Sequence, residues 1–369
     1  MISKFFILIF FLLMRFFLLY DGGGDRRPLI MVDNWNLEEV HSEEPAFMLK
    51  DDSTEVVYEV ILLKDEYGVP YAYGSHILTP VCDDSLCALM NIEVYWNLLG
   101  NYIGYDTIAG DPLTKNDHLP FLTKDYQKLH QLLSDDNSII KRKEKHELFD
   151  SEAKRVSEVV DAVTGATAKE ISEAVVDGAL YSCYTLYHIV YGPLSKSILA
   201  DMESRYTASL QEHFLKSKYS DYQLYVLKRL TENDFIEQQD RILELIHQAI
   251  PLNRLYIMKK MPESMWMDEK IQLAISGFFG DLDGNSMTYF LRKMGSVGQI
   301  NPQIILDLIQ HMEELSQNQL KMLIQIFEQN NMTTELTDSV KKILGRGQMT
   351  FGFLLEDYLD ENEKQNTEN

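Results

Sequence analysis

Positive charge is scarce in this chain of 369 residues: Lys and Arg number 34 against 57 Asp and Glu, for a formal net charge of −23 at pH 7. So acidic a surface repels phosphate backbones and anionic lipid headgroups, which argues against nucleic acid as a partner. The basic run at residues 141–145 is short and followed by acids, as in a solvated loop or helix end. The length is enough for about two domains, and a hydrophobic content of 45% is ordinary for a chain that folds over most of its length.

Cysteine is also scarce, with three residues in all. Cys82 and Cys87 are close enough in sequence for a small-loop disulfide in an exported protein, and two free thiols are the equal alternative. A zinc site would need a second Cys pair or His ligands, which the sequence does not place nearby. Cys183 lies in an apolar helical stretch, where we expect a small buried hydrophobe. No Cys precedes Cys82, which excludes a lipoprotein anchor for this start codon.

Motifs of catalysis and metal binding are missing. The sequence has no Gly-x-Ser-x-Gly, no phosphate loop and no dinucleotide-binding glycine pattern. His76, His118, His130 and His146 are scattered without a metal-ligand spacing, so we predict surface or core histidines. Residues 281–285 are similar to a calcium loop, but the glycine stands at the fourth position instead of the sixth, which indicates a turn between helices. The sequence therefore predicts neither a catalytic residue nor a metal ligand.

The N-terminal residues 1–24 have the pattern of a targeting segment. Lys4 supplies a positive charge, residues 5–14 are apolar without a break, and Arg15 then interrupts the run. A membrane span needs about 20 clean apolar residues, so we favour a signal peptide over a membrane anchor. A start at Met14 would shorten the apolar run and weaken the expectation of export. We expect a periplasmic or otherwise exported protein, with membrane association through this segment as the second reading.

The next part of the chain, residues 25–195, mixes strand and helix patterns and predicts an α+β domain. A polar leader reaches residue 50, and helices begin at Thr123, near residue 151 and near residue 168. Strands are expected at residues 55–63 and 71–74, with a hairpin at 91–108. The last helix is expected to run unbroken to Tyr191, with an apolar stripe formed by Ile171, Ala174, Val175, Ala179, Cys183, Leu186 and Val190.

Residues 196–359 read as helix after helix and contain an internal repeat. A six-residue pattern that begins with Tyr recurs at residues 225–230, 256–261 and 289–294, and each copy is followed by a second amphipathic run. Paired helices at a period of 20–50 residues are typical of an α-solenoid. The pattern resembles HEAT-type repeats in a general way. Residues 360–369 are acidic and rich in Asn, and we expect them to be disordered.

The most specific stretch is residues 160–167, which read Val-Asp-Ala-Val-Thr-Gly-Ala-Thr. It places a turn of small residues directly before a helix pattern. Thr167 and Glu170 have the spacing of a capping box, in which each side chain bonds the backbone N–H of the other residue. Gly165 supplies the backbone freedom that such a turn needs. A helix start of this kind also presents free N–H groups, which suit a phosphate.

The same stretch resembles the flavinylation motif of FMN-binding domains, which include the flavin-carrying subunits of sodium-pumping NADH:quinone oxidoreductases. In that family the last Thr carries FMN through a phosphoester bond, and a separate flavin transferase forms this bond outside the cytoplasm. The resemblance covers roughly residues 55–192. It implies covalent FMN at Thr167 and these cofactor-binding residues: Asp161, Thr164, Gly165, Ala166 and Thr167.

Two functions follow from these expectations. In the first, the chain is an exported electron-transfer component that carries FMN at Thr167 and docks a redox or scaffold protein through its helical repeats. In the second, it is an exported interaction protein without catalysis, whose FMN-binding-like domain has diverged and holds no flavin. Both use the repeats as a binding surface, since solenoids present extended surfaces without chemistry of their own.

Overall fold

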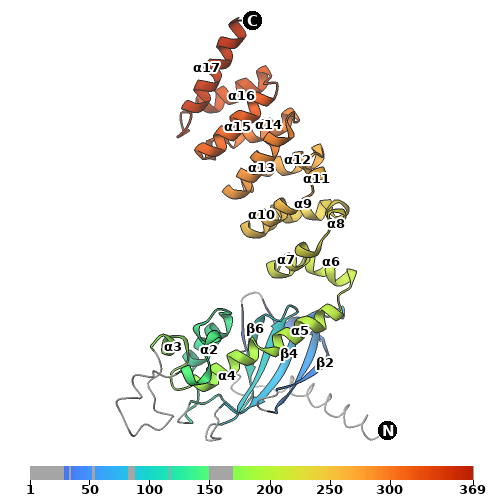
Figure 1. Ribbon diagram of the computed structural model, residues 1–369, viewed down its shortest axis with the longest axis vertical. Coiled ribbons are helices and arrows are strands. Elements are labelled where there is room, and N and C mark those ends of the chain that lie inside the picture. Colours follow the sequence, from blue (N-terminus) through green and yellow to red (C-terminus); the bar gives the residue numbers. More distant parts are fainter. Residues whose placement is uncertain are drawn as a thin grey trace. The chain divides into compact units, whose positions relative to one another are not determined.

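The computed structural model describes residues 29–32, 35–51, 55–81, 88–115, 118–148 and 169–368 (Figure 1). The chain divides into two compact units, Met1–Leu210 and Gln211–Asn369. The targeting segment, the predicted helix near residue 151, the motif at 160–167 and the pair Cys82 and Cys87 lie outside the described residues.

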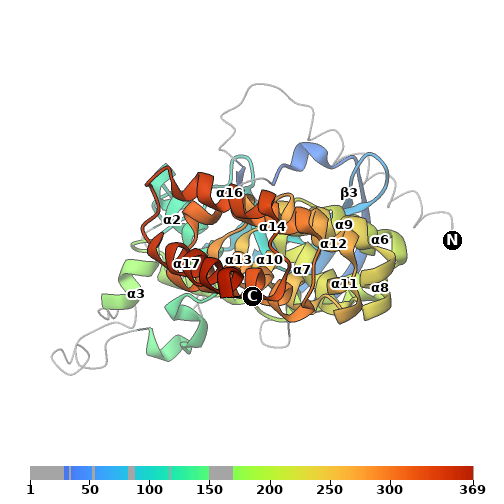
Figure 2. The same ribbon diagram turned by 90° about the horizontal axis from the view of Figure 1, so that it is seen from above.

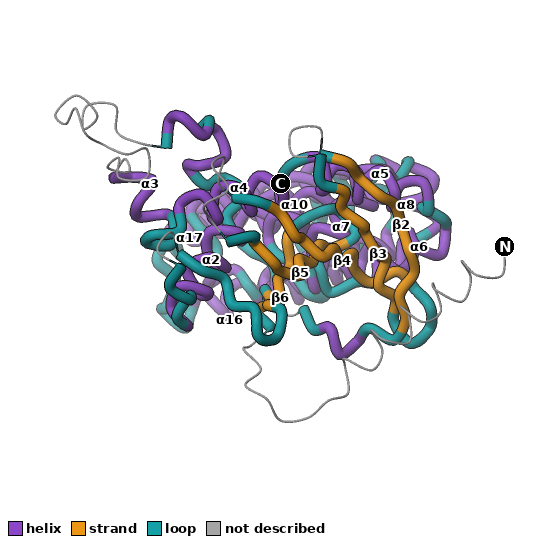
Figure 3. Tube along the Cα trace, turned by 90° about the horizontal axis from the view of Figure 1, so that it is seen from below, coloured by secondary structure: helices purple, strands orange, loops and turns teal. Residues whose placement is uncertain are grey.

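The first unit is built on an antiparallel sheet with the strand order β1-β6-β5-β4-β3-β2 (Figure 3). From β2 to β6 each strand pairs with the next one along the chain, and β1 pairs with β6. Gly68 and Gly100 turn the chain between strands with φ of 74° and 77°, values that favour glycine. The strands are β1 (Ile30–Met31), β2 (Ser42–Lys50), β3 (Val57–Lys64), β4 (Pro70–Thr79), β5 (Met90–Asn97) and β6 (Tyr102–Thr107).

Strand β2 lies in a segment that we expected to be irregular, so that expectation was wrong. It is an edge strand of the described sheet, paired on one side with β3, and none of its residues is fully buried. Its register shifts between Pro45 and Phe47. Edge strands tolerate proline and charge, and both weaken the apolar alternation by which a strand is recognised.

One face of the sheet forms the core of the first unit together with three helices: α2 (Thr123–Ser134), α4 (Leu180–Val190) and α5 (Pro193–Ser204) (Figure 1). Tyr73 and Trp96 are cross-strand partners on this face and are fully buried. The Trp96 indole N–H donates to the carbonyl oxygen of Val190 in α4 at 3.0 Å. The Tyr105 hydroxyl donates to the carbonyl oxygen of Tyr126 in α2 at 2.7 Å. The sheet and helices form the α+β arrangement that the sequence predicts.

The opposite face is covered in part by the chain that leads from β1 to β2. Leu63 and Ile103 belong to an apolar cluster on this face, against which Met31 and Trp35 pack. Gly104 is required beneath β1, because a Cβ at this position would lie only 2.6 Å from the backbone carbonyl oxygen of Ile30. The short helix η1 (Leu37–Glu39) lies in the same covering segment.

The expected long helix ending at Tyr191 is two helices, α3 (Lys169–Ala174) and α4, so the prediction of one unbroken helix was wrong. Gly178 separates them with φ of 72°, a left-handed conformation that an α-helix cannot contain. Ile171, Val175 and Cys183 of the predicted stripe are nevertheless buried. The helix expected to begin at Thr123 is confirmed as α2. Short helices η2 (Ile139–Arg142) and η3 (Lys145–Glu147) lie between α2 and α3.

The first unit ends at Leu210, later than the boundary we expected at residue 195. The reason is α5, whose residues Leu194, Ile198 and Met202 are buried and which is hydrogen-bonded to the sheet. The predicted boundary at residue 195 falls near the beginning of α5 and therefore inside this unit.

The second unit is helical throughout its described residues. It contains α6 (Ala208–Lys216, which begins within the first unit), α7 (Ser220–Arg229), α8 (Glu232–Glu237), α9 (Gln239–Gln248), α10 (Pro251–Lys260), α11 (Glu263–Trp266), α12 (Glu269–Ser276), η5 (Phe279–Asp281), α13 (Gly284–Val297), α14 (Pro302–Gln310), η6 (Met312–Glu314), α15 (Gln317–Gln329), α16 (Thr334–Leu344) and α17 (Phe353–Glu368). Helix α17 includes residues 360–368, for which we expected disorder. Glu, Lys and Gln in this segment favour helix, and Leu355 and Tyr358 anchor its beginning.

The helices of the second unit contact one another in two rows (Figure 2). In one row α7 contacts α10, α10 contacts α13, α13 contacts α15, and α15 contacts α17. In the other row α9 contacts α12, α12 contacts α14, and α14 contacts α16. The three copies of the repeated pattern fall in α7, α10 and α13, which are consecutive members of the first row.

Candidate functional site

The five residues that resemble the flavin-binding motif, among them the capping residue Thr167, lie outside the described residues. The chain is described again from α3, which begins at Lys169. Ile171 and Val175 are buried here, while Glu170 is exposed. Helix α3 contacts η2, so the chain just beyond the motif is packed on the first unit.

Aromatic residues of the sheet belong to the protein core. Tyr73, Trp96 and Tyr105 are fully buried and donate their polar hydrogens to protein acceptors. The Tyr102 hydroxyl lies 2.9 Å from Nδ1 of His130 on α2. All four side chains are buried, and the polar contacts described for them are with other protein atoms, as is typical of core aromatic residues.

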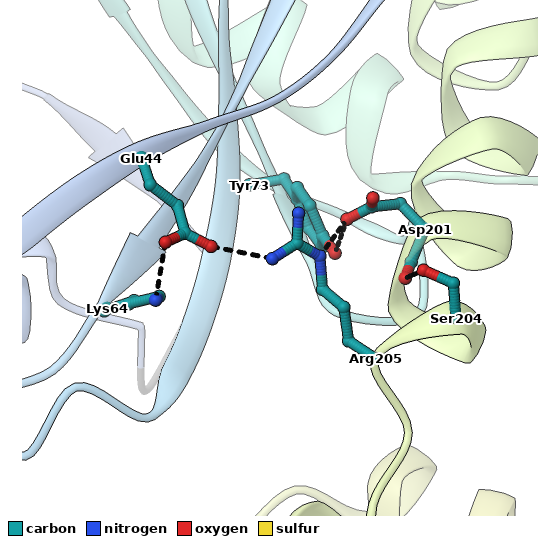
Figure 4. A network of polar contacts seen from close by, with 6 residues as sticks. All are labelled: Glu44, Lys64, Tyr73, Asp201, Ser204 and Arg205. Carbon is teal, nitrogen blue, oxygen red and sulfur yellow. Dashed lines mark hydrogen bonds and ion pairs between the residues drawn. The ribbon is translucent and has the colours of Figure 1, made fainter.

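A network of charged residues joins α5 to the sheet (Figure 4). Glu44 on β2 accepts from Lys64 Nζ on β3 and from a terminal guanidinium nitrogen of Arg205, both at 2.7 Å. Asp201 accepts from Arg205 Nε and from the Tyr73 hydroxyl, both through Oδ2 and both at 2.7 Å. The network thus connects three strands of the sheet with α5 and with the residue that follows this helix.

The charges of the network balance one another. Two carboxylates, Glu44 and Asp201, face two cations, Lys64 and Arg205. The hydrogen bond from Lys64 outweighs the effect of burial and, together with Arg205, lowers the pKa of Glu44. Burial raises the pKa of Tyr73, and the neighbouring Asp201 carboxylate raises it further, so the hydroxyl keeps its proton. We interpret the network as a structural clamp, because its charges are satisfied within it.

Sequence reasoning missed this network. Glu44 lay in the supposed irregular leader, and its contact with Arg205 spans 161 residues of sequence. The only local signal is the spacing of Asp201 and Arg205, which are four residues apart at the end of a helix.

A second polar group lies on the other face of the sheet, which is the one that Met31 partly covers. His76 Nε2 is 2.6 Å from Asn91 Oδ1, and Asn91 Nδ2 donates to Asp111 Oδ2 at 2.7 Å. The bond to Asp111 fixes which end of the Asn91 side chain is the amide nitrogen, so His76 must donate through Nε2. In the part of the chain that the structure describes, no three His, Cys, Asp or Glu residues are placed to hold a metal ion.

Cys183 is fully buried in α4, which confirms the prediction of a small core residue. Burial raises the pKa of its thiol to about 12, so the thiolate is not formed at neutral pH. The backbone N–H of Val176 donates to its sulfur at 3.4 Å. This cysteine is therefore a structural residue of the first unit.

Hydrogen bonds between helices of the second unit recur at one repeat length. Asn253 donates to the carbonyl oxygen of Ser220, and Lys260 donates to that of Leu227, in each case across 33 residues. The corresponding separations are 31 residues for Ser276 and Asp307 and 35 residues for the bond from Gln319 to Gly284. The offsets between the repeated sequence patterns, 31 and 33 residues by subtraction of 225, 256 and 289, agree with these separations.

The calcium-like stretch at residues 281–285 is a turn between helices, as we predicted. Asp283 precedes α13 and accepts hydrogen bonds from the backbone N–H groups of Asn285 and Ser286. Its other oxygen accepts from Arg254 on α10 at 3.1 Å. The carboxylate is therefore a helix cap that also joins two neighbouring helices.

The chain matches no family model, no curated protein and no solved structure. Within the residues that the structure describes, no helix is long and apolar enough to cross a membrane. Function must therefore be argued from the motif and from the architecture of the two units.

Proposed function

We propose that this protein is an exported electron-transfer component in which the first unit carries FMN on Thr167 and the second unit is an α-solenoid that docks a partner protein. The observation that carries the docking role is the recurrence of hydrogen bonds between helices at separations of 31–35 residues. Each repeat then contacts its neighbours, which leaves a long row of helix surfaces available for a partner.

The flavin proposal is supported by the sequence at residues 161–167 and by its position directly before α3. A threonine hydroxyl can form a phosphoester, and a flavin supplies electron transfer when it is bound. The protein would contribute the attachment residue Thr167 and the packed helix that follows it. The redox or scaffold protein that exchanges electrons with the flavin would bind the solenoid.

The alternative is an exported interaction protein with the same solenoid and no flavin. It is favoured by the extent of the helical repeats, which need no cofactor for binding. The two proposals differ in a single covalent bond, so one measurement separates them.

The experiment is co-expression of the whole chain with an active flavin transferase, followed by intact mass measurement and in-gel fluorescence. We expect an adduct of FMN mass in the wild-type protein and in Thr123→Ala, a variant at an exposed threonine outside the motif. Thr167→Ala should abolish the adduct. An unmodified wild-type protein, obtained while the transferase modifies a known substrate in the same cells, would leave the flavin-free alternative.

A further inference from the structure

The repeated sequence pattern places the same two kinds of side chain on three neighbouring helices of the second unit. On each of α7, α10 and α13, a half-buried tyrosine is followed three residues later by an exposed cation. Helix α10 contacts both α7 and α13, so the pairs follow one another across adjacent helices (Figure 1). We call this set the cation ladder, and it consists of Tyr225 and Lys228, Tyr256 and Lys259, and Tyr289 and Arg292.

The cations of the ladder are not used by the fold. The side chains of Lys228, Lys259 and Arg292 are exposed and make no hydrogen bond or ion pair with any described residue. On each of the three helices the next residue is a second cation that contacts the protein, and on α7 this is Arg229, which lies over the ring of Tyr225, 3.4 Å from the ring centroid. Lys260 donates to the carbonyl oxygen of Leu227 at 2.6 Å, and Lys293 pairs with Glu263 at 2.5 Å.

The rest of the exposed stripe is mostly uncharged. One turn before the tyrosine, α10 carries Leu252, which is 74% exposed, and α13 carries Asn285. The corresponding residue of α7, four residues before Tyr225, is Asp221 at the beginning of the helix. The ladder ends after α13, because Met322 and Gln325 of α15 stand 33 residues beyond its last tyrosine and cation. Three positive charges are therefore set apart on a protein whose net charge is −23.

The spacing of the ladder indicates the shape of its ligand. Packed helices lie about 8–10 Å apart, and an extended segment in the polyproline II conformation advances about 3.1 Å per residue with three residues per turn, so that every third side chain lies on the same side. Carboxylates at every third residue of an extended segment therefore match cations on successive helices. The hydroxyls of Tyr256 and Tyr289 bond to no described residue, and they can donate to main-chain carbonyl groups. An extended segment leaves those carbonyl groups free, whereas a helix uses them internally.

We propose that the cation ladder binds an extended acidic segment of a partner protein, with Asp or Glu at every third residue lying across α7, α10 and α13. This inference rests on the proposed solenoid and gives its partner a chemistry. The overall negative charge of the protein disfavours binding to nucleic acid and to anionic membranes. A short acidic segment can instead bind the cation ladder, because it needs only this local group of positive charges.

The probe is a fluorescein-labelled peptide of Ser and Ala with Glu at every third residue, titrated with the full chain in low salt and followed by anisotropy. In the triple variant Lys228→Glu, Lys259→Glu and Arg292→Glu we expect binding to weaken by about tenfold or more, since each exposed pair contributes a small increment. Binding by the wild type should also weaken as salt is added.

The matched control is the triple variant Lys196→Glu, Lys270→Glu and Lys342→Glu, which changes the net charge equally at exposed positions away from the ladder. It should bind the peptide within about twofold of the wild type. A control peptide with the same composition and its Glu residues adjacent should bind more weakly. Equal loss of binding in both variants, or equal binding of both peptides, would overturn the proposal, as would tighter binding to duplex DNA or anionic vesicles.

The solenoid is tested separately with a chain that ends at Gln310, after α14, and so retains the ladder. In a repeat protein each helix contacts only its neighbours, so the helices that remain after truncation keep their structure. We expect the helical circular dichroism per residue and the cooperative unfolding to persist. Loss of both would reject the solenoid, whereas an intact truncated chain that ignores the peptide would reject only the ladder.

Discussion

The hydroxyl of Tyr73 shows how one polar group can position a helix. Its ring lies within the core, fully removed from solvent, while its oxygen reaches the Asp201 carboxylate of α5 at 2.7 Å. Asp201 is also held by Arg205, so the carboxylate does not depend on the tyrosine alone. A hydrogen bond to a charged group in such a place is worth more than an exposed one, because water cannot replace it as readily.

We predict that Tyr73→Phe lowers the free energy of unfolding of the first unit by about 1–2 kcal/mol, since it removes this hydrogen bond and keeps the buried ring. The measurement is urea denaturation followed by near-ultraviolet circular dichroism. Tyr67→Phe is the control, because Tyr67 is 81% exposed and should change the stability by less than about 0.5 kcal/mol. Equal midpoints for the two variants would show that the hydrogen bond from Tyr73 does not stabilise the first unit.

At the scale of helices and strands, the periodicity of apolar residues predicts which residues are buried more reliably than it predicts whether a helix is unbroken. Ile171, Val175, Ala179 and Cys183 follow one another at every fourth residue and are all buried, which is why the sequence predicted one helix there. The helix is interrupted between α3 and α4, where Gly178 has a φ of 72°. This is a property of the backbone that the pattern of side chains does not show. The opposite error occurred at β2, where an edge strand with few buried side chains left no clear alternation.

Asp283 caps the N-terminus of helix α13. The sequence predicted a turn at this place but not the cap. Burial on its own raises the pKa of Asp283, but hydrogen bonds from Ser286 and Arg254 outweigh it and hold the pKa below its usual range. An aspartate whose pKa is lowered on folding contributes stability above its unfolded pKa, near 3.9, and loses this contribution as the pH falls through the folded value.

We predict that Asp283→Asn destabilises the second unit by about 1–2 kcal/mol at pH 7, since asparagine still caps the helix but cannot pair with Arg254 as a charge. The difference from the wild type should shrink as the pH is lowered below about 4. Guanidinium denaturation at both pH values measures it. Asp338→Asn is the control, because Asp338 is exposed on α16 and has no described partner. A pH-independent difference would assign the effect to packing.

At the scale of the whole chain, local repetition was predictable and long-range pairing was not. The copies at residues 225, 256 and 289 fall on consecutive helices of one row, so the sequence located the helical region correctly. The contacts that close the first unit join residues 128 and 161 positions apart, as in the pairs Tyr73 with Asp201 and Glu44 with Arg205. No local pattern encodes such a pair, which is why the predicted boundary at residue 195 differs from the division of the chain at Leu210.

This difference in boundary can be measured with two chains that begin at Leu29 and end at Ser195 or at Leu210. The shorter chain loses Ile198 and Met202, whose buried side chains contribute roughly 3–6 kcal/mol together, and it loses both charged partners that α5 brings to the sheet. Since a domain is stable by only about 5–15 kcal/mol, we expect the longer chain to unfold cooperatively on heating and the shorter one to be molten or insoluble. Thermal melts followed by near-ultraviolet circular dichroism distinguish them. Two equally cooperative melts would show that the first unit is complete at residue 195 and that α5 is a linker instead of a part of its core.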